Sequence, residues 1–108
     1  MKVKELAQIE GFSAAVLCDG EREIGGVYIG DLLSWVMGRA SMDDAWITIM
    51  SNINILAVAS LADTSCIIIA EGVSLEEDVL KTAREKNINI IYSESPIYET
   101  AVCLNRSI

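Results

Sequence analysis

Apolar residues are gathered along this chain into short runs, and polar residues and glycines fill the turns between the runs. Most of these runs are apolar at nearly every position, which is typical of strands covered on both faces of a sheet. Five strands are predicted, at residues 13–18, 27–29, 45–50, 66–70 and 88–92. The central strand is 45–50, in which Thr48 is the only polar residue.

Helices are expected between these strands. They are predicted at residues 4–9, 32–37, 53–63 and 75–86, and a last helix begins at Pro96. Helical segments of about ten residues between strands indicate right-handed crossovers between parallel strands. The predicted fold class is therefore α/β, a layered fold with a parallel or mixed sheet of about five strands and helices on its faces. A length of 108 residues fits a single domain over residues 1–108.

The predicted helix at 53–63 follows the central strand and has almost no polar face. Isoleucine, leucine and valine side chains are spread around its circumference, and alanines fill much of the rest. A helix that is apolar all round is buried on more than one side. A sheet can cover one side, and a chain of this length leaves little for the other. The sequence therefore predicts a homodimer in which a second copy covers this helix.

The charge of the chain excludes several classes of partner. Sixteen Asp and Glu stand against eight Lys and Arg, which gives a net charge of −8, and the cations form no basic run. Nucleic acid and anionic membrane surfaces are not expected as partners, because both are bound through clustered cations. No apolar run approaches the length of a membrane span, and the first residues lack the apolar core of a secretion signal. The predicted localisation is cytoplasmic.

Several signatures of enzyme chemistry are missing from this sequence. Histidine is absent, which removes the commonest general base and the commonest transition-metal ligand. Cys18, Cys66 and Cys103 are far apart within apolar runs and are expected to be buried, reduced thiols. The sequence contains no Gly-x-x-x-x-Gly-Lys-Ser/Thr, Gly-x-Gly-x-x-Gly or Gly-x-Ser-x-Gly motif. No catalytic residue, metal ligand or cofactor is predicted, and the chain is expected not to be an enzyme.

The turns that follow the predicted strands form the candidate binding site. In open α/β sheets, ligands bind beyond the carboxyl ends of the strands, where such turns gather along one edge. The candidate ligand-binding residues are Asp31, Ser51, Asn52, Asn54, Glu71, Gly72 and Ser93. They offer amides, hydroxyls, carboxylates and helix N-termini, but the acidic side chains disfavour a free phosphate. The set suits a neutral or hydroxyl-bearing group, or a nucleotide base and its sugar.

Helix capping is a competing explanation for several of these residues. Asp31 and Ser51 are placed to cap the helices that follow them, and Ser74 begins a capping-box pattern. Asn54 opens a strongly apolar helix although asparagine is a poor helix former, so that ligand contact and local capping both stay open there. The two tryptophans are expected to lie in the core rather than to form stacking platforms.

Four segments of the sequence resemble those of a known family. They are Gly30–Gly38 (GDLLSWVMG), Asp44–Ile49 (DAWITI), Asn54–Ala59 (NILAVA) and Ala70–Gly72 (AEG). Together they resemble the small stand-alone DRTGG-domain proteins of anaerobic bacteria, over nearly the whole chain. The resemblance implies an α/β fold similar to the N-terminal domain of HPr kinase/phosphorylase. It also implies a regulatory or dimerising module, since DRTGG domains occur beside CBS domains in regulated pyrophosphatases and in some phosphotransacetylases.

The name-giving motif of that family is altered in this chain. Ser51–Asn52–Ile53 stands where typical members place Gly–Asp–Arg, and Ala70–Glu71–Gly72 stands where they place Thr–Gly–Gly. HPr kinase activity is not implied, because this sequence contains no phosphate loop. Stand-alone members tend to be encoded near iron-hydrogenase or redox-sensing genes, which implies a protein partner in a redox or hydrogenase system.

Two functions follow as hypotheses. The leading one is a non-catalytic regulatory module that binds a small molecule, with an adenine nucleotide as the candidate, at the strand-end loops and acts as a homodimer. The alternative is a protein-interaction or scaffold subunit of a redox or signalling system with no small-molecule ligand.

Overall fold

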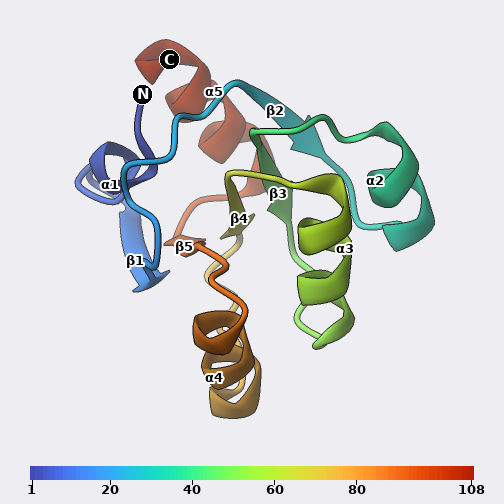
Figure 1. The fold of residues 1–108 in the computed structure, drawn as a ribbon. Coiled ribbons are helices and arrows are strands. Elements are labelled where there is room, and N and C mark those ends of the chain that lie inside the picture. Colours follow the sequence, from blue (N-terminus) through green and yellow to red (C-terminus); the bar gives the residue numbers. More distant parts are fainter.

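A mixed five-stranded sheet lies between two layers of helices in the computed structural model, which describes residues 1–108 (Figure 1). The strands are β1 (Phe12–Val16), β2 (Gly26–Ile29), β3 (Asp44–Thr48), β4 (Cys66–Ile69) and β5 (Ile90–Ser93). The helices are α1 (Val3–Leu6), α2 (Leu33–Arg39), α3 (Asn54–Ala62), α4 (Glu77–Glu85) and α5 (Ile97–Ser107). The predicted α/β fold class is confirmed. None of the helices is both long and apolar enough to span a membrane.

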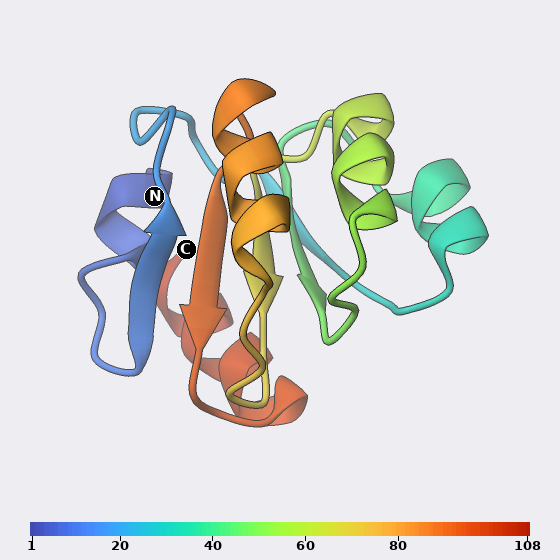
Figure 2. The same ribbon diagram turned by 90° about the horizontal axis from the view of Figure 1, so that it is seen from below.

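The strands follow the order β1-β5-β4-β3-β2 across the sheet. Strands β2 to β5 are parallel, and β1 pairs with β5 in the antiparallel direction. Helices α2, α3 and α4 connect successive parallel strands and lie on one face, whereas α1 and α5 lie on the other (Figure 2). Because β2 to β5 run the same way, the connections after them leave at one edge of the sheet, here called the carboxyl edge. The connections that lead into them arrive at the opposite, amino edge.

Each face of the central strands packs into its own hydrophobic core. Trp46 and Ile67 belong to the core under α2, α3 and α4, whereas Ile47 and Ile68 belong to the core under α1 and α5. All four side chains are fully buried. Neighbouring residues of a strand point to opposite faces, so a strand covered on both sides needs apolar residues at every position. This explains the continuous apolar runs at β3 and β4.

Helix α3 is covered by the sheet and by α2, and one side of it stays open. Its buried residues are Ile55, Leu56, Val58 and Ala59. Val36 of α2 is part of the same core, so α2 covers some of the surface that the sequence assigned to a second copy. Ile53 and Leu61 remain exposed, Leu61 with 71% of its surface accessible.

Several local predictions are wrong in the structure. Helix α4 begins later than the capping-box pattern at Ser74 suggests, because the amide of Leu75 donates to the hydroxyl of Tyr92 at 3.0 Å. Trp35 is 52% exposed rather than in the core, since it lies on the outer side of α2. Cys18 is exposed as well, because β1 ends at Val16 and leaves this thiol on the following loop.

Candidate functional site

The seven predicted ligand-binding residues all lie at the carboxyl edge. Five of them are in the connections that follow β2, β3 and β4, whereas Asn54 is the first residue of α3 and Ser93 the last residue of β5. The turn after β2 is attached to the end of β3. One carboxylate oxygen of Asp31, Oδ1, accepts from the hydroxyl of Thr48 at 2.7 Å and from the amide of Ile49 at 3.1 Å. Asp31 therefore joins two neighbouring connections and makes no capping hydrogen bond to α2, whose N-cap is Leu32.

The turns after β4 and β5 form a second joined pair. The amide of Gly72 donates to the carbonyl of Ser93 at 3.1 Å, and the carboxylate of Glu71 accepts from the amide of Ile97 at the start of α5. Glu71 and Gly72 have φ values of 63° and 70°, in the left-handed region that favours glycine. The hydroxyl of Ser93 is buried and lies 2.7 Å from that of Thr100.

The turn after β3 presents the most accessible polar groups of this edge. Ser51, Asn52 and Asn54 are all exposed. The N-cap of α3 is Ile53 and no side chain caps the helix, so the predicted cap by Ser51 is wrong. Asn52 instead forms an Asx turn, since its side-chain oxygen accepts from the amide of Asn54 at 2.9 Å. The side chains of Ser51 and Asn54 make no hydrogen bond within the chain. The carboxyl edge is thus an ordered polar rim, and neither of the two cavities of the structure lies there.

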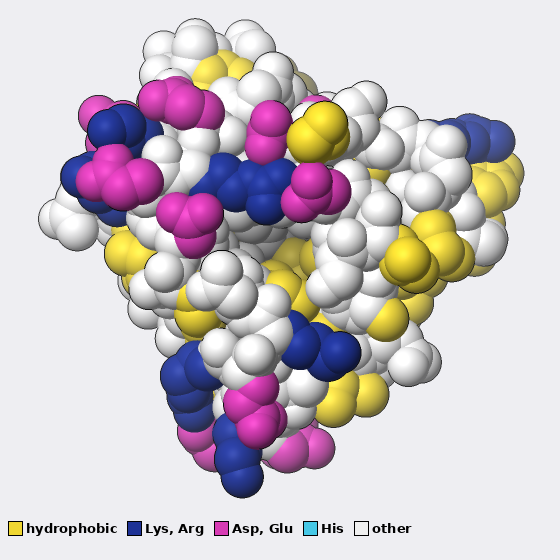
Figure 3. Space-filling view, viewed as in Figure 1, with side chains coloured by type: hydrophobic (Ala, Val, Ile, Leu, Met, Phe, Trp, Pro, Cys, Tyr) yellow, Lys and Arg dark blue, Asp and Glu magenta, His cyan; other side chains and the backbone are white.

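The larger group of converging polar side chains lies at the amino edge, in a cleft that we call the amino-edge cleft. It has a volume of about 260 Å³ and opens between the C-terminal ends of α3 and α4. Its lining residues are Asp19, Arg22, Ala59, Ser60, Asp63, Thr64, Ser65, Lys86, Asn87, Ile88 and Asn89. Figure 3 looks onto this edge and shows basic atoms flanked by acidic ones beside a hollow in the surface.

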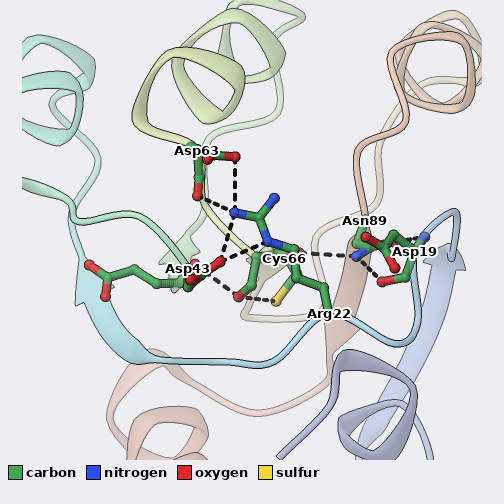
Figure 4. Close-up of polar contacts among 8 residues, drawn as sticks. Asp19, Arg22, Asp43, Asp63, Cys66 and Asn89 are labelled. Atoms are coloured by element: carbon green, nitrogen blue, oxygen red, sulfur yellow. Dashed lines mark hydrogen bonds and ion pairs between the residues drawn. The ribbon is translucent and has the colours of Figure 1, made fainter.

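Arg22 crosses the amino edge and ties three segments together (Figure 4). Its Nε donates to the carboxylate of Asp43 at 3.0 Å, and its Nη2 donates to the carboxylate and carbonyl of Asp63 at 2.9 and 2.6 Å. Partial burial disfavours the charged guanidinium, but the hydrogen bonds to the two carboxylates outweigh that effect and raise the pKa of Arg22. Its remaining nitrogen, Nη1, has no hydrogen-bond partner.

Asn89 closes the other side of the cleft through four hydrogen bonds. Its side-chain oxygen accepts from the amides of Cys18 and Asp19, each at 2.9 Å. Its amide nitrogen donates to the carbonyls of Asp19 and Ser65 at 2.8 and 3.0 Å. The loop after β1 is thereby fixed against the connections that enter β4 and β5.

Two further side chains at this edge are buried. Thr64 is 7% exposed, and its hydroxyl is a buried side-chain polar atom without a hydrogen-bond partner. Behind it, burial raises the pKa of the Cys66 thiol to about 12, so that the thiol stays protonated and unreactive at neutral pH. No group of three or more Cys, Asp or Glu side chains is placed to hold a metal ion.

Little in the amino-acid sequence indicates this cleft. Arg22 lies in Glu21–Arg22–Glu23, which has the composition of a solvated connection, and its partner Asp63 is 41 residues away.

A second cavity, of about 280 Å³, is lined by residues of α5 alone, so it is a shallow groove along one helix.

A sequence model of the DRTGG domain family matches residues 8–107. The chain belongs to the DRTGG domain family. No curated protein matches the sequence. The fold of this DRTGG domain is similar to a crystal structure of the CBS and DRTGG domains of the regulatory region of Clostridium perfringens pyrophosphatase, complexed with its activator diadenosine tetraphosphate. The TM-score is 0.71 at 15% sequence identity, with 90% of this chain and 43% of the other covered.

Both segments of the altered name-giving motif lie at the carboxyl edge of this DRTGG domain. Residues 51–53 follow β3, and residues 70–72 follow β4, which are adjacent parallel strands. The amide of Ala70 donates to the carbonyl of Thr48 at 3.0 Å, so the pairing of the two strands extends to the beginning of this motif.

Proposed function

We propose that this chain is a non-catalytic regulatory module that binds a small molecule at the carboxyl edge and acts as a homodimer. Membership of the DRTGG family carries this proposal, together with the likeness of the fold to the regulatory region of a pyrophosphatase. The regulatory region of that pyrophosphatase is complexed with diadenosine tetraphosphate, which makes adenine nucleotides the first ligands to test.

The turn after β3 supports the proposed position of the ligand. Ser51 and Asn54 offer an unpaired hydroxyl and an unpaired carboxamide on exposed backbone. The two neighbouring turns are held in place by the bonds of Asp31 and Glu71, so a ligand would meet a rim that is already ordered. The carboxylates there disfavour phosphate groups, so we expect contacts with the base and ribose of a nucleotide.

A thermal-shift measurement with AMP, ATP, diadenosine tetraphosphate and adenosine tests this function. A ligand that binds the folded chain at about 100 times its Kd stabilises it by roughly 2.7 kcal/mol, which raises Tm by several degrees. We expect such a rise with at least one of the four compounds. No rise with any of them would contradict binding of an adenine compound.

A pair of asparagine variants then locates the site. Asn54→Ala should leave Tm of the free chain nearly unchanged, since its side chain makes no hydrogen bond, but should reduce the rise caused by the ligand. Asn105→Ala removes a similarly exposed carboxamide from α5 and should leave the rise unchanged. Equal rises in the two variants would place the ligand elsewhere.

An apolar surface on α2 and α3 supports the proposed homodimer. This α2–α3 surface consists of Leu32, Trp35, Met37, Ile53 and Leu61, all of them exposed. Hydrophobic side chains gather at this side of the molecule in Figure 3. The two helices carry a single charged residue, Arg39, and no acid. Two chains of net charge −8 repel each other less across helices that carry no acidic residue, which favours a second copy as the occupant.

The same surface is the observation that favours the alternative, a protein-interaction or scaffold subunit of a redox or hydrogenase system. Exposed apolar surface on a soluble protein is a common feature of interaction sites. Capture of a stoichiometric redox protein by the native chain but not by Trp35→Glu, with no thermal shift from any nucleotide, would favour this alternative over the regulatory module.

A further inference from the structure

We propose that the amino-edge cleft is a binding site for a small, uncharged, polyhydroxylated solute of about the size of a monosaccharide. The site lies at the opposite edge of the sheet from the loops of the proposed function and requires neither a nucleotide nor a dimer. It is argued from the unpaired polar groups of the cleft, its charge, its lining and its size.

The first argument is that the cleft holds hydrogen-bonding groups without partners. Nη1 of Arg22 makes no bond, although Nε and Nη2 of the same guanidinium make several. The exposed Lys86 has no ion pair or hydrogen bond within the chain. These two donors can bond to a solute that enters the cleft, whereas the unpaired hydroxyl of Thr64 is too deeply buried for a solute to reach.

The second argument is that the charges of the cleft disfavour an anion. Arg22 is already paired with Asp43 and Asp63. Asp19 and Lys86 carry opposite charges in the lining, although they form no ion pair. The C-terminal ends of α3 and α4 face the same space, and helix C-termini carry partial negative charge. A phosphate or carboxylate ligand would therefore meet no net attraction, whereas the oxygens of an uncharged ligand can accept from Nη1 and from the Lys86 ammonium.

The third argument comes from the lining and the volume. Only Ala59 and Ile88 among the lining residues are hydrophobic, and none is aromatic, so a nucleobase has no surface on which to stack. Sites for drug-sized ligands have volumes of roughly 300–1,000 Å³ and mostly apolar walls. At about 260 Å³ and with polar walls, this cleft suits a smaller molecule that is bonded through hydroxyl groups.

The fourth argument is that the cleft is held in shape without a ligand. Arg22 joins the entry to β2 to the connections around Asp43 and Asp63, and Asn89 joins the loop after β1 to the start of β4. Little conformational entropy is then lost when a solute binds, because the walls are already ordered.

An NMR titration of the isotope-labelled chain with D-glucose, D-ribose and myo-inositol tests the site. We expect at least one of these compounds to shift the backbone amides of residues 59–65 and 86–89, and not those of residues 51–54. Glucose 6-phosphate and AMP serve as charged comparisons and should bind the cleft more weakly. The proposal is overturned if no sugar or polyol shifts the cleft amides, or if the phosphorylated sugar binds there more tightly.

Two lysines of the same helical segment provide a matched pair of variants. Lys86→Ala removes an unpaired donor from the cleft and should weaken binding about tenfold, as expected for a charged hydrogen bond. Lys81→Ala removes an exposed lysine from α4 that does not line the cleft, and should leave binding unchanged. Equal affinities of the two variants would overturn the site. Nucleotide-induced shifts at residues 51–54 bear only on the proposed function, so the two proposals can fail separately.

Discussion

The carboxamide of Asn89 is 3% exposed and makes four hydrogen bonds to backbone groups of two other segments, the loop after β1 and the connection that enters β4. Replacing it with alanine leaves those backbone groups buried without a partner, which costs about 1–3 kcal/mol for each such group that water cannot reach. We expect Asn89→Ala to lower the free energy of unfolding by about 2–4 kcal/mol, measured by urea denaturation. The fluorescence of the fully buried Trp46 reports the unfolding.

Asn87 supplies the control for that variant, because it is exposed and has a φ of 61°. Asn87→Gly keeps the left-handed backbone accessible and removes no hydrogen bond, so it should change the free energy of unfolding by less than about 0.5 kcal/mol. A similar loss in both variants would show that the stability of this loop does not come from the bonds of Asn89.

Asn87 and Asn89 also show which properties of a single residue cannot be predicted from the sequence. Asn87–Ile88–Asn89 places two identical side chains around a buried isoleucine, and nothing in the sequence separates their roles. The partners of Asn89 are up to 71 residues away along the chain, so its role depends on which strands become neighbours. Arg22 is a second example, because its carboxylate partners are 21 and 41 residues away.

At the scale of elements, Gly38 and Gly72 respond in opposite ways to the same substitution. Gly38 lies within α2, and a Cβ there would meet no atom within 4 Å. Gly38→Ala should raise the free energy of unfolding by about 0.5–1 kcal/mol, because glycine is a poor helix former. Gly72 also has open space, but its φ is 70°, so Gly72→Ala should lower the free energy of unfolding by roughly 1 kcal/mol. Changes of the same sign in thermal unfolding would contradict the left-handed turn after β4.

Helix α1 is held to the connection after β1 by charge, which predicts a response to acid. Hydrogen bonds from Lys2 and Lys4, with their charges, lower the pKa of the exposed Glu21 carboxyl from its usual 4.5 to about 2. A carboxyl with a lowered pKa in the folded state contributes stability above its unfolded pKa, and this contribution is lost as the pH falls through about 2. We expect NMR titration to place the midpoint of Glu21 near that value. Replacing both Lys2 and Lys4 with methionine should return the midpoint toward 4.5, and an unchanged midpoint would exclude the lysines as its cause.

The elements that the sequence predicts best are those that depend on the pattern of neighbouring residues alone. The apolar runs of β3 and β4 predict strands covered on both sides, and both faces of these strands are fully buried in the structure. Helix starts were predicted less well, because distant groups compete for the same donors and acceptors. The hydroxyl of Tyr92 binds the amide of Leu75, and Thr48 and Ile49 bind the carboxylate of Asp31, which was expected to cap α2.

At the scale of the whole molecule, the direction of the strands decides which residues can meet. Alternating strands and helices predict parallel pairs, and this is enough to bring the turns after β2 to β5 to one edge. The antiparallel position of β1 beside β5 is not encoded in any local pattern. The amino-edge cleft depends on that position, because β1 carries the loop that Asn89 fixes. The sequence could therefore suggest the carboxyl edge as a site but not the amino-edge cleft.

The proposed homodimer predicts that a glutamate substitution on the α2–α3 surface prevents association, whereas the same substitution on the opposite helix layer does not. Leu61 lies on the α2–α3 surface and is 71% exposed, so Leu61→Glu should not disturb the fold of a single chain. In a dimer that uses this surface, the substitution would bury a carboxylate without a partner, which costs several kcal/mol and should abolish association. Sedimentation velocity at micromolar concentration should therefore show a dimer for the native chain and a species of 11.7 kDa for Leu61→Glu.

Tyr98 is the matched control for this prediction, because it is 74% exposed and lies on α5, in the helix layer on the other face of the sheet. Tyr98→Glu adds the same charge to the chain and should leave the dimer intact. Loss of the dimer in both variants would mean that added charge alone drives the chains apart. A native chain that sediments as a monomer at tens of micromolar would remove the homodimer from the proposal. The α2–α3 surface would then remain open to a different protein, as the interaction-subunit alternative requires.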